Sequence, residues 1–307
     1  MKIAYLILCH IDPAHICRLA KKLTEGTQNE VFVHVDGKCD VHPFEETLSG
    51  LERVHLLSHR VKVHWGGYSA VEATILLMRT ALAAGDFGKY ILLQGLEYPI
   101  KSNREIDRFL EADPKREYML AQNISRIHDV RQEHKYRLFY VLDHAKCLPL
   151  RVMHKINKTM MLHQVVPHLK PDFVKDCHGR KMEIYAGCAQ FGLTQEAVRY
   201  IVQFHDENPG FNRYFKTVYA VDEAYFHTIL YNSEFVTFTQ EGQARERPKL
   251  TDFENLTYFE YPKYIRLFTS KEEWPILRDS GFLYFRKASS ESKELLDYID
   301  ALHQNEE

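Results

Sequence analysis

The feature that most constrains the fold of this chain is an alternation of apolar runs with amphipathic segments over the first 120 residues. The first run, IAYLILC at residues 3–9, has no charged residue, and such a run is typical of a strand buried on both faces of a parallel sheet. The segment 69–85 has helical spacing and ends at Gly85. This β-α-β order predicts an α/β fold with a mostly parallel central sheet flanked by helices, and ligands at the carboxyl ends of its strands. Further strands are expected at 30–36, 53–58, 90–95 and 117–122.

A middle segment of different composition separates the first part of the chain from later segments that again have strand and helix patterns. Residues 123–182 are rich in His, Lys and Arg, and we expect a long connection there with one or two helices. No clean linker interrupts the chain, so a single domain, 1–307, is predicted. Ser102 with Glu105 and Ser270 with Glu273 have the spacing of capping boxes. Later strands are expected at 187–193, 235–239 and 282–287, and later helices at 194–210 (capped by Thr194), 222–232, 270–281 and 292–303.

Composition excludes several classes of protein. Lys plus Arg (40) nearly balances Asp plus Glu (42), which argues against a nucleic-acid or membrane-surface binder. The six cysteines form no C-x-x-C pair, so free thiols in a reducing compartment are expected. The apolar start is too short for a membrane span. We therefore expect no membrane span, and a cytoplasmic protein or one peripheral at the inner face of the membrane.

The seventeen histidines do not form a recognisable metal motif. The chain has no H-E-x-x-H, and His163 and His168 lack a third ligand nearby, although zinc needs three or four. No D-x-D is present either. Glu97 is a single acid at a strand end where many nucleotide-sugar transferases carry a D-x-D metal motif. We expect no bound metal.

Polar residues at predicted strand ends are the first candidates for a ligand site. His10 and Asp36 follow the first two strands, and Asp36 either makes a turn or accepts hydrogen bonds from a ribose or base. Trp65 and Gly66 precede a helix, where a glycine makes a tight turn or lets the backbone approach a ligand. Each position has an ordinary structural explanation when judged alone.

The pair Asp222–Glu223 opens an apolar helical segment. It could be a helix start, a metal site or a catalytic base, and Asp222 as N-cap with Glu223 in the first turn is the simplest interpretation. Near the carboxyl terminus, Arg266, Arg286 and Lys287 are either solvated charges or the cations that bind a diphosphate.

Seven motifs in order resemble the core-2/I-branching β-1,6-N-acetylglucosaminyltransferases, a family that includes peptide O-xylosyltransferases. They are IAYLILCHIDP, VFVHVDGK, VHWGGYSAVEA, YILLQGLEYPIKSNREI, GCAQFGLTQEAVRYIV, VDEAYFHTIL and FLYFRK. The resemblance covers nearly the whole chain and is weakest over 123–182. It implies a GT-A-like, Rossmann-related fold and an inverting, metal-independent transfer from a UDP-sugar. In such an enzyme 1–122 would bind the nucleotide, 123–182 would face the acceptor, and 183–307 would carry the base and the diphosphate cations.

The resemblance also implies roles for single residues. Glu223 falls on the catalytic base, and Lys287 on the lysine that holds the diphosphate. Arg266 is the better match to the partner arginine, with Arg286 as the other choice. The remaining donor-side residues are His10, Asp36, Trp65 and Gly66, and the acceptor- or sugar-side residues are Glu97, Tyr98, Gly187, Cys188, Gln190 and Asp222.

The motifs also depart from the family pattern. Cys188 stands in place of a serine, Gln190 in place of an aromatic residue, and Glu97 in place of an aspartate. The donor sugar stays open between N-acetylglucosamine, xylose and glucose, and the acceptor between a glycan and a lipid-linked glycan. A bacterial enzyme of surface polysaccharide or glycoconjugate synthesis is expected. The alternatives are a non-catalytic nucleotide- or glycan-binding relative and a metal-dependent transferase.

Overall fold

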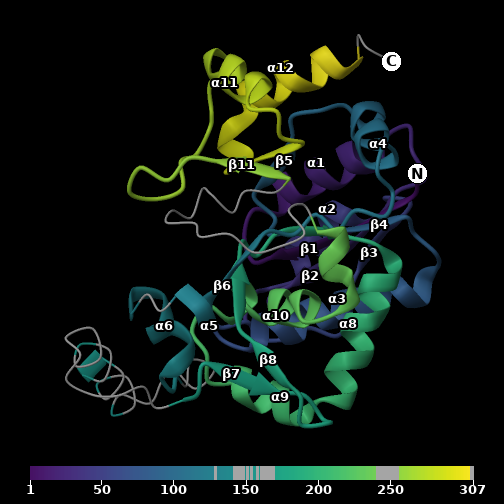
Figure 1. Ribbon diagram of the computed structural model, residues 1–307. Coiled ribbons are helices and arrows are strands. Elements are labelled where there is room, and N and C mark those ends of the chain that lie inside the picture. The colour runs from purple at the N-terminus through teal and green to yellow at the C-terminus, as the bar shows by residue number, and fades with distance from the viewer. Residues whose placement is uncertain are drawn as a thin grey trace.

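A computed structural model of the chain describes residues 1–127, 130–140, 170–239 and 256–304, with isolated helical positions between 149 and 159. Its centre is a five-stranded sheet in the order β10-β4-β1-β2-β3. Four of these strands are parallel, and β10 runs antiparallel beside β4. The predicted α/β architecture with a mostly parallel, GT-A-like central sheet is confirmed (Figure 1). The strands span β1 Ile3–Cys9, β2 Glu30–Val35, β3 Val54–Leu56, β4 Lys89–Leu93 and β10 Phe191–Leu193.

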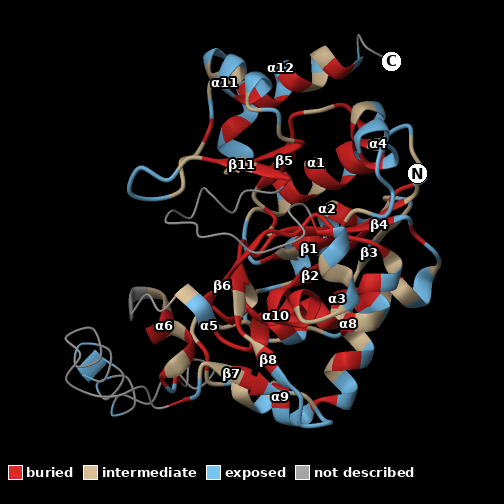
Figure 2. Cartoon of the chain, in the orientation of Figure 1, coloured by how far each residue is buried: buried red, intermediate tan, exposed pale blue. Residues whose placement is uncertain are grey.

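Burial on both faces explains why β1 reads as an unbroken apolar run. Ala4 and Leu6 face one hydrophobic cluster, and Tyr5 and Ile7 face another. Side chains alternate between the faces of a strand, so both sets must be apolar. Figure 2 shows the resulting buried layer along the sheet, with exposed residues on the outer surfaces of the helices.

Helices cover both faces of this sheet. Helix α1, Pro13–Thr24, packs in the cluster that includes Tyr5, together with α12, Lys293–Gln304. Helix α3, Ser69–Ala84, packs in the other, with α8 Gln195–Glu207 and α10 Tyr225–Tyr231. The other α-helices given by the described ranges are α2 His42–Leu48, α4 Asn103–Glu111, α5 Ile124–Ile127, α6 Val130–Arg137, α9 Pro209–Phe215 and α11 Trp274–Asp279.

Helix starts follow the predicted capping signals. Ser102 and Glu105 form a complete capping box at α4, and Thr194 accepts a hydrogen bond from Ala197 N at the start of α8. Ser270 and Glu273 form the second box, which opens the 3-10 turn η5, Lys271–Glu273, directly before α11. These side chains satisfy backbone N–H groups that the first helical turn leaves without partners.

A smaller sheet joins distant parts of the chain. Its order is β11-β12-β5, with β5 Glu97–Pro99, β11 Thr257–Phe259 and β12 Tyr284–Arg286. The antiparallel register of β12 and β5 sets Arg286 opposite Glu97. Two further pairs complete the strands: β6 Ala121–Asn123 with β9 Tyr185–Gly187, and β7 Phe173–Lys175 with β8 Lys181–Glu183.

Three strand predictions were wrong in detail. The segment 187–193 is not one strand, because Gly187 ends β9, residues 188–190 lie in neither strand, and β10 begins at Phe191. The segment 235–239 lies in a 3-10 helix, η3 Glu234–Phe238, because Ser233 accepts a hydrogen bond from Phe235 N and starts a helical turn. In 117–122, only the end enters a strand, β6, while Glu117 and Tyr118 form isolated bridges. Of the middle segment, the described part contains α5 and α6, in agreement with the expected helices. None of the described helices is both long and apolar enough to span a membrane.

Candidate active site

A pocket of about 240 Å³ lies where the central sheet meets the smaller sheet. Gln94, which directly follows β4, is part of its wall. The pocket therefore sits at the carboxyl end of a parallel strand, where ligands of such sheets bind. Seven of the predicted site residues line it together: Trp65, Gly66, Cys188, Gln190, Asp222, Glu223 and Arg286.

The two carboxylates enter this pocket on a 3-10 turn, η2 Val221–Glu223. The prediction that Asp222 caps the following helix was wrong, because Ala224 occupies the N-cap position of α10 and makes no side-chain cap bond. Ala220 has φ 52°, a left-handed conformation that redirects the chain before the turn. Val221 is fully buried beneath the turn, which leaves residues 222 and 223 facing the pocket.

Lys135, which the sequence did not single out, contacts Glu223. Its Nζ lies 3.2 Å from Glu223 Oε2, and both side chains are about one-quarter exposed, at 24% and 28%. Lys135 belongs to α6, and its carbonyl oxygen accepts a hydrogen bond from Tyr219 N at 2.9 Å. The middle segment therefore contributes a charge to the site. The basic composition of 123–182 was the only signal for it.

The carboxyl group of Asp222 has a raised pKa. Burial raises the pKa of Asp222 to about 6, and the adjacent Glu223 acts in the same direction, while Lys135 opposes it. Two carboxylates that share a small site repel each other when both are ionised. The ammonium of Lys135 offsets part of that repulsion.

Three other lining residues, Arg286, Gln190 and Cys188, belong to a buried hydrogen-bond network. Arg286 Nη1 donates to Glu97 Oε1 at 2.5 Å, and Glu97 is fully buried. Gln190 Nε2 donates to the same oxygen at 3.2 Å, and Cys188 Sγ lies 2.7 Å from Gln190 Oε1. Burial raises the pKa of the Cys188 thiol to about 12, so this thiol stays protonated and acts as a donor. The second Glu97 oxygen accepts from the backbone of Gln94 and Leu96.

Gly187, at the end of β9, directly precedes Cys188 of this hydrogen-bond network. A Cβ at this position would collide with the carbonyl oxygen of Leu120 and would lie 2.9 Å from His227 Nε2. His227 is itself fully buried, and burial lowers its pKa to about 3. Glycine is therefore required here so that β6, β9 and α10 can pack closely behind the pocket.

The remaining candidate cations lie next to Arg286. Lys287 N donates to Arg266 O at 3.0 Å, which brings the two segments side by side. Arg266 is already paired with Glu260 at 2.7 Å and Glu273 at 2.5 Å. Among the described residues, the Lys287 ammonium has no ion-pair partner, so it is the cation most available to an anionic ligand.

The other seven predicted residues do not line the pocket. Glu97, Gly187, Arg266 and Lys287 lie in the surroundings already described, and Asp36, His10 and Tyr98 have other positions. Asp36 Oδ1 accepts from Lys38 N and Val63 N at 2.9 and 3.1 Å, which shapes the loop after β2. His10 is exposed after β1. Tyr98 is fully buried, and its hydroxyl bonds to Asp300 at 2.8 Å, which gives it a structural role between β5 and α12.

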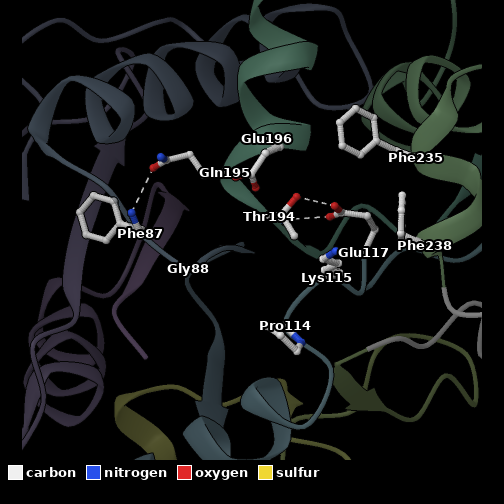
Figure 3. Close-up of a pocket in the computed structure, with 10 residues that line it drawn as sticks. All are labelled: Phe87, Gly88, Pro114, Lys115, Glu117, Thr194, Gln195, Glu196, Phe235 and Phe238. Atoms are coloured by element: carbon white, nitrogen blue, oxygen red, sulfur yellow. Dashed lines mark hydrogen bonds between the residues drawn. The ribbon is translucent and has the colours of Figure 1, made fainter.

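A larger cavity, of about 550 Å³, lies away from these carboxylates at the amino-terminal end of β4 (Figure 3). Phe87, Phe235 and Phe238 give it apolar walls. Its buried carboxylate, Glu117, accepts hydrogen bonds from both the backbone N and the hydroxyl of Thr194, so that group is already satisfied. Size alone therefore does not make this cavity the catalytic site.

The described residues contain no group of three His, Cys, Asp or Glu side chains placed to hold a metal ion.

A family model described as Core-2/I-Branching enzyme matches residues 3–246. The chain belongs to this family. The match spans the central sheet, the η2 turn with Glu223 and the segment around Lys135, and it ends before Arg266 and Arg286. The identity inferred from the seven motifs is thus confirmed.

Individual relatives of this Core-2/I-branching chain are distant. A human protein, the probable beta-1,3-galactosyl-O-glycosyl-glycoprotein beta-1,6-N-acetylglucosaminyltransferase 7, is 27% identical over 114 residues. That stretch is 36% of this chain and 26% of the human protein, so the chain matches about a quarter of that relative's length. The structure of apo mouse xyloside xylosyltransferase 1 overlaps 75% of this chain and 82% of its own, with 10% identity and a TM-score of 0.29. A similarity at that level is too weak to inform on activity.

Proposed function

We propose that this chain is an inverting, metal-independent glycosyltransferase that moves a sugar from a UDP-sugar to a hydroxyl group of a glycan. The observation that carries the proposal is the pocket that Glu223 and Arg286 both line, which brings a carboxylate and a cation into one site. Family membership supports the same reaction class.

The reaction needs a base for the acceptor. As the acceptor oxygen forms its bond to the anomeric carbon, its proton passes to a Glu223 oxygen. The bond from that carbon to the diphosphate breaks, and its electron pair leaves with UDP. Because the new bond forms on the face opposite the leaving group, the configuration at this carbon inverts. Asp222 stays beside the base and tunes the local charge.

The leaving diphosphate needs positive charge as its bond breaks. Lys287 is the best candidate, because its ammonium is not paired with a described carboxylate, whereas Arg266 is held between Glu260 and Glu273. Arg286 contributes from the pocket wall, where Glu97 fixes its guanidinium. The loops that follow β1 and β2, with His10 and Asp36, are the proposed place of the uridine.

The identities of the transferred sugar and of the acceptor are further parts of this proposal. N-acetylglucosamine, xylose and glucose all remain as transferred sugars, and the acceptor is a glycan or lipid-linked glycan, in surface polysaccharide or glycoconjugate synthesis. The human relative's name includes transfer of N-acetylglucosamine to a glycoprotein glycan, which favours that sugar as the first to test.

The experiment is a thermal-shift series with UDP and the three UDP-sugars, followed by a UDP-release assay. A ligand at 100 times its Kd stabilises the folded state by about 2.7 kcal/mol, so a selective donor gives a clear increase in melting temperature. Lys287→Ala should weaken UDP binding, and unchanged affinity would rule out its diphosphate role. EDTA should leave UDP release unchanged. Loss of UDP release in the presence of EDTA would support the metal-dependent alternative.

A non-catalytic, nucleotide- or glycan-binding relative is the second candidate. The replacements at Cys188 and Gln190 favour it, since both side chains lie in the pocket wall. Binding of UDP-sugars without UDP release, across donors and acceptors, would favour this alternative over the enzyme.

A further inference from the structure

Two aromatic side chains form a corner at the pocket that contains Glu223. The ring centroids of Trp65 and Tyr219 are 5.5 Å apart, with an interplanar angle of 74°. Trp65 is 80% exposed and also lines the pocket. A tryptophan has a large apolar surface whose exposure to water is unfavourable, and exposed aromatic surface beside a pocket commonly marks a binding site. Packing against the part of the chain that the structure describes does not explain the position of this indole.

The Tyr219 side of this corner is fixed by contacts with Tyr140 and by backbone hydrogen bonds. Tyr140 is buried, and its ring lies 5.4 Å from that of Tyr219. Backbone hydrogen bonds from Tyr140 N to Thr217 O and from Tyr219 N to Lys135 O, both of 2.9 Å, fix the segment that carries Tyr219. A preorganised aromatic surface binds a ligand with less loss of conformational entropy than a mobile one.

The corner lies on the side of the base. Tyr219 precedes Glu223 by one short turn, and Val221 N contacts the carbonyl oxygen of Gly66, next to Trp65. Arg286 lies on a different element, β12. In an inverting displacement the attacking hydroxyl and the leaving diphosphate lie on opposite sides of the anomeric carbon. The Trp65–Tyr219 corner is therefore on the acceptor side of the reaction centre.

The size of the pocket limits what it can enclose. Its volume of about 240 Å³ is below the range of roughly 300–1,000 Å³ that is usual for sites that enclose a drug-sized ligand. Both substrates together do not fit within it. An acceptor larger than one sugar must continue over the rim, where Trp65 is located.

We propose that the Trp65–Tyr219 corner is an acceptor subsite that stacks against the C–H face of a sugar ring beyond the one whose hydroxyl reacts. The acceptor is then an oligosaccharide. The flat faces of the two rings match the C–H face of a sugar, and a peptide acceptor, to which the indole N–H and the tyrosine hydroxyl could also hydrogen-bond, is the other outcome of the test. The inference rests on the proposed function, and it moves Trp65 from the donor side, where the family resemblance had placed it, to the acceptor side.

The test uses the two tryptophans of the chain, Trp65 and Trp274. In a Trp274→Phe variant of the full chain, Trp65 is the only indole, so its fluorescence reports on the corner directly. The probes are galactose, a β-1,3-linked galactose disaccharide, N-acetylglucosamine and its β-1,4-linked dimer and tetramer. We expect at least one oligosaccharide to shift the emission and to bind roughly 3- to 10-fold more tightly than its monosaccharide, whereas UDP leaves the emission unchanged.

Two substitutions complete the design, both measured by calorimetry with the same probes. Trp65→Ala should weaken oligosaccharide binding about tenfold and leave UDP binding unchanged. Phe109→Ala is the matched control, because Phe109 is an exposed aromatic residue on α4 that does not line the pocket, and it should change neither affinity.

Three results would overturn the inference. The first is an emission shift with UDP alone, which indicates stacking on the nucleobase. The second is a shift with a serine-containing peptide but with no saccharide, and the third is no response to any saccharide. Stabilisation of the same variant by UDP-sugars separates these failures from a failure of the proposed function. If UDP-sugars still stabilise the protein and yield UDP, only the acceptor subsite is wrong.

Discussion

Lys135 and Glu223 form an ion pair across 88 residues of sequence, with 3.2 Å between Nζ and Oε2. The pair links the described part of the middle segment to the proposed base. The ammonium fixes the orientation of the carboxylate and compensates part of the negative charge of Asp222 and Glu223. A base held in one orientation reacts faster than one that rotates freely.

Lys135→Met should therefore lower kcat by about tenfold or more and change stability little. A partly exposed ion pair contributes on the order of 0–1 kcal/mol to folding, so the melting temperature is expected to stay nearly constant. Lys135→Arg keeps the charge and should recover part of the activity. Lys175→Met is the control, because Lys175 is exposed on β7, and it should behave as the wild type. Equal kcat values for Lys135→Met and the control would show that the pair has no part in catalysis.

Arg286→Met should be strongly destabilising. It leaves the carboxylate of Glu97 fully buried without its cation, and loss of one partner of a buried pair costs roughly 3–5 kcal/mol. Thermal unfolding measures the loss. Adding Glu97→Gln to Arg286→Met should restore part of the stability, since the remaining side chain is then neutral. Arg278→Met removes an exposed pair with Asp279 and should leave the melting temperature unchanged. A similarly small effect for Arg286→Met would contradict the buried-pair account.

Asp222 should make folding stability depend on pH between about 4 and 6. The pKa of Asp222 is raised to about 6 in the folded chain and is about 3.9 in the unfolded chain. As pH rises, the folded state therefore keeps this proton to a higher pH than the unfolded state. The contribution of Asp222 to the free energy of unfolding is greatest below pH 4 and declines as the pH rises to 6. Relative to Asp222→Asn, the wild type should lose about 1–3 kcal/mol over that interval. Denaturant unfolding at a series of pH values measures this difference, and parallel curves for the two proteins would contradict the assignment.

Gly187→Ala should prevent normal packing behind the pocket. The new methyl group would overlap the Leu120 carbonyl oxygen, and backbone cannot move aside as a flexible side chain can. We expect a large decrease in melting temperature or loss of soluble protein. Gly210→Ala is a matched control on α9, where nothing lies within 4 Å of the new Cβ, and it should be neutral or stabilise by up to about 1 kcal/mol. Equal melting temperatures for the two variants would show that Gly187 has room for a side chain.

The sequence predicted the elements whose signals are local. The strand at 3–9 was identifiable because burial on both faces requires an unbroken apolar run. The starts of α4 and α8 were identifiable because a capping side chain lies next to the backbone it satisfies. The cap predicted for Asp222 failed for the opposite reason. The left-handed conformation of Ala220 turns the chain there, and alanine gives no sign of it.

The site was predictable in its residue types and not in its contacts. Glu223, Arg286, Cys188 and Gln190 were all candidates, and the pocket brings them together. Arg286 meets Glu97 only through the register of β12 against β5, and no local pattern encodes a pairing 189 residues apart. Lys135 was missed because it is one of many basic residues in a segment without recognisable motifs.

The most direct test of the proposed function is the rate of sugar transfer by Glu223→Gln, measured beside its affinity for UDP. The substitution keeps the size of the side chain and removes its ability to accept a proton. Loss of a general base typically reduces the rate 10²- to 10⁴-fold. We predict a decrease of that size in transfer from the UDP-sugar that binds, with the affinity for UDP unchanged. Near-normal transfer by Glu223→Gln would contradict the proposed mechanism.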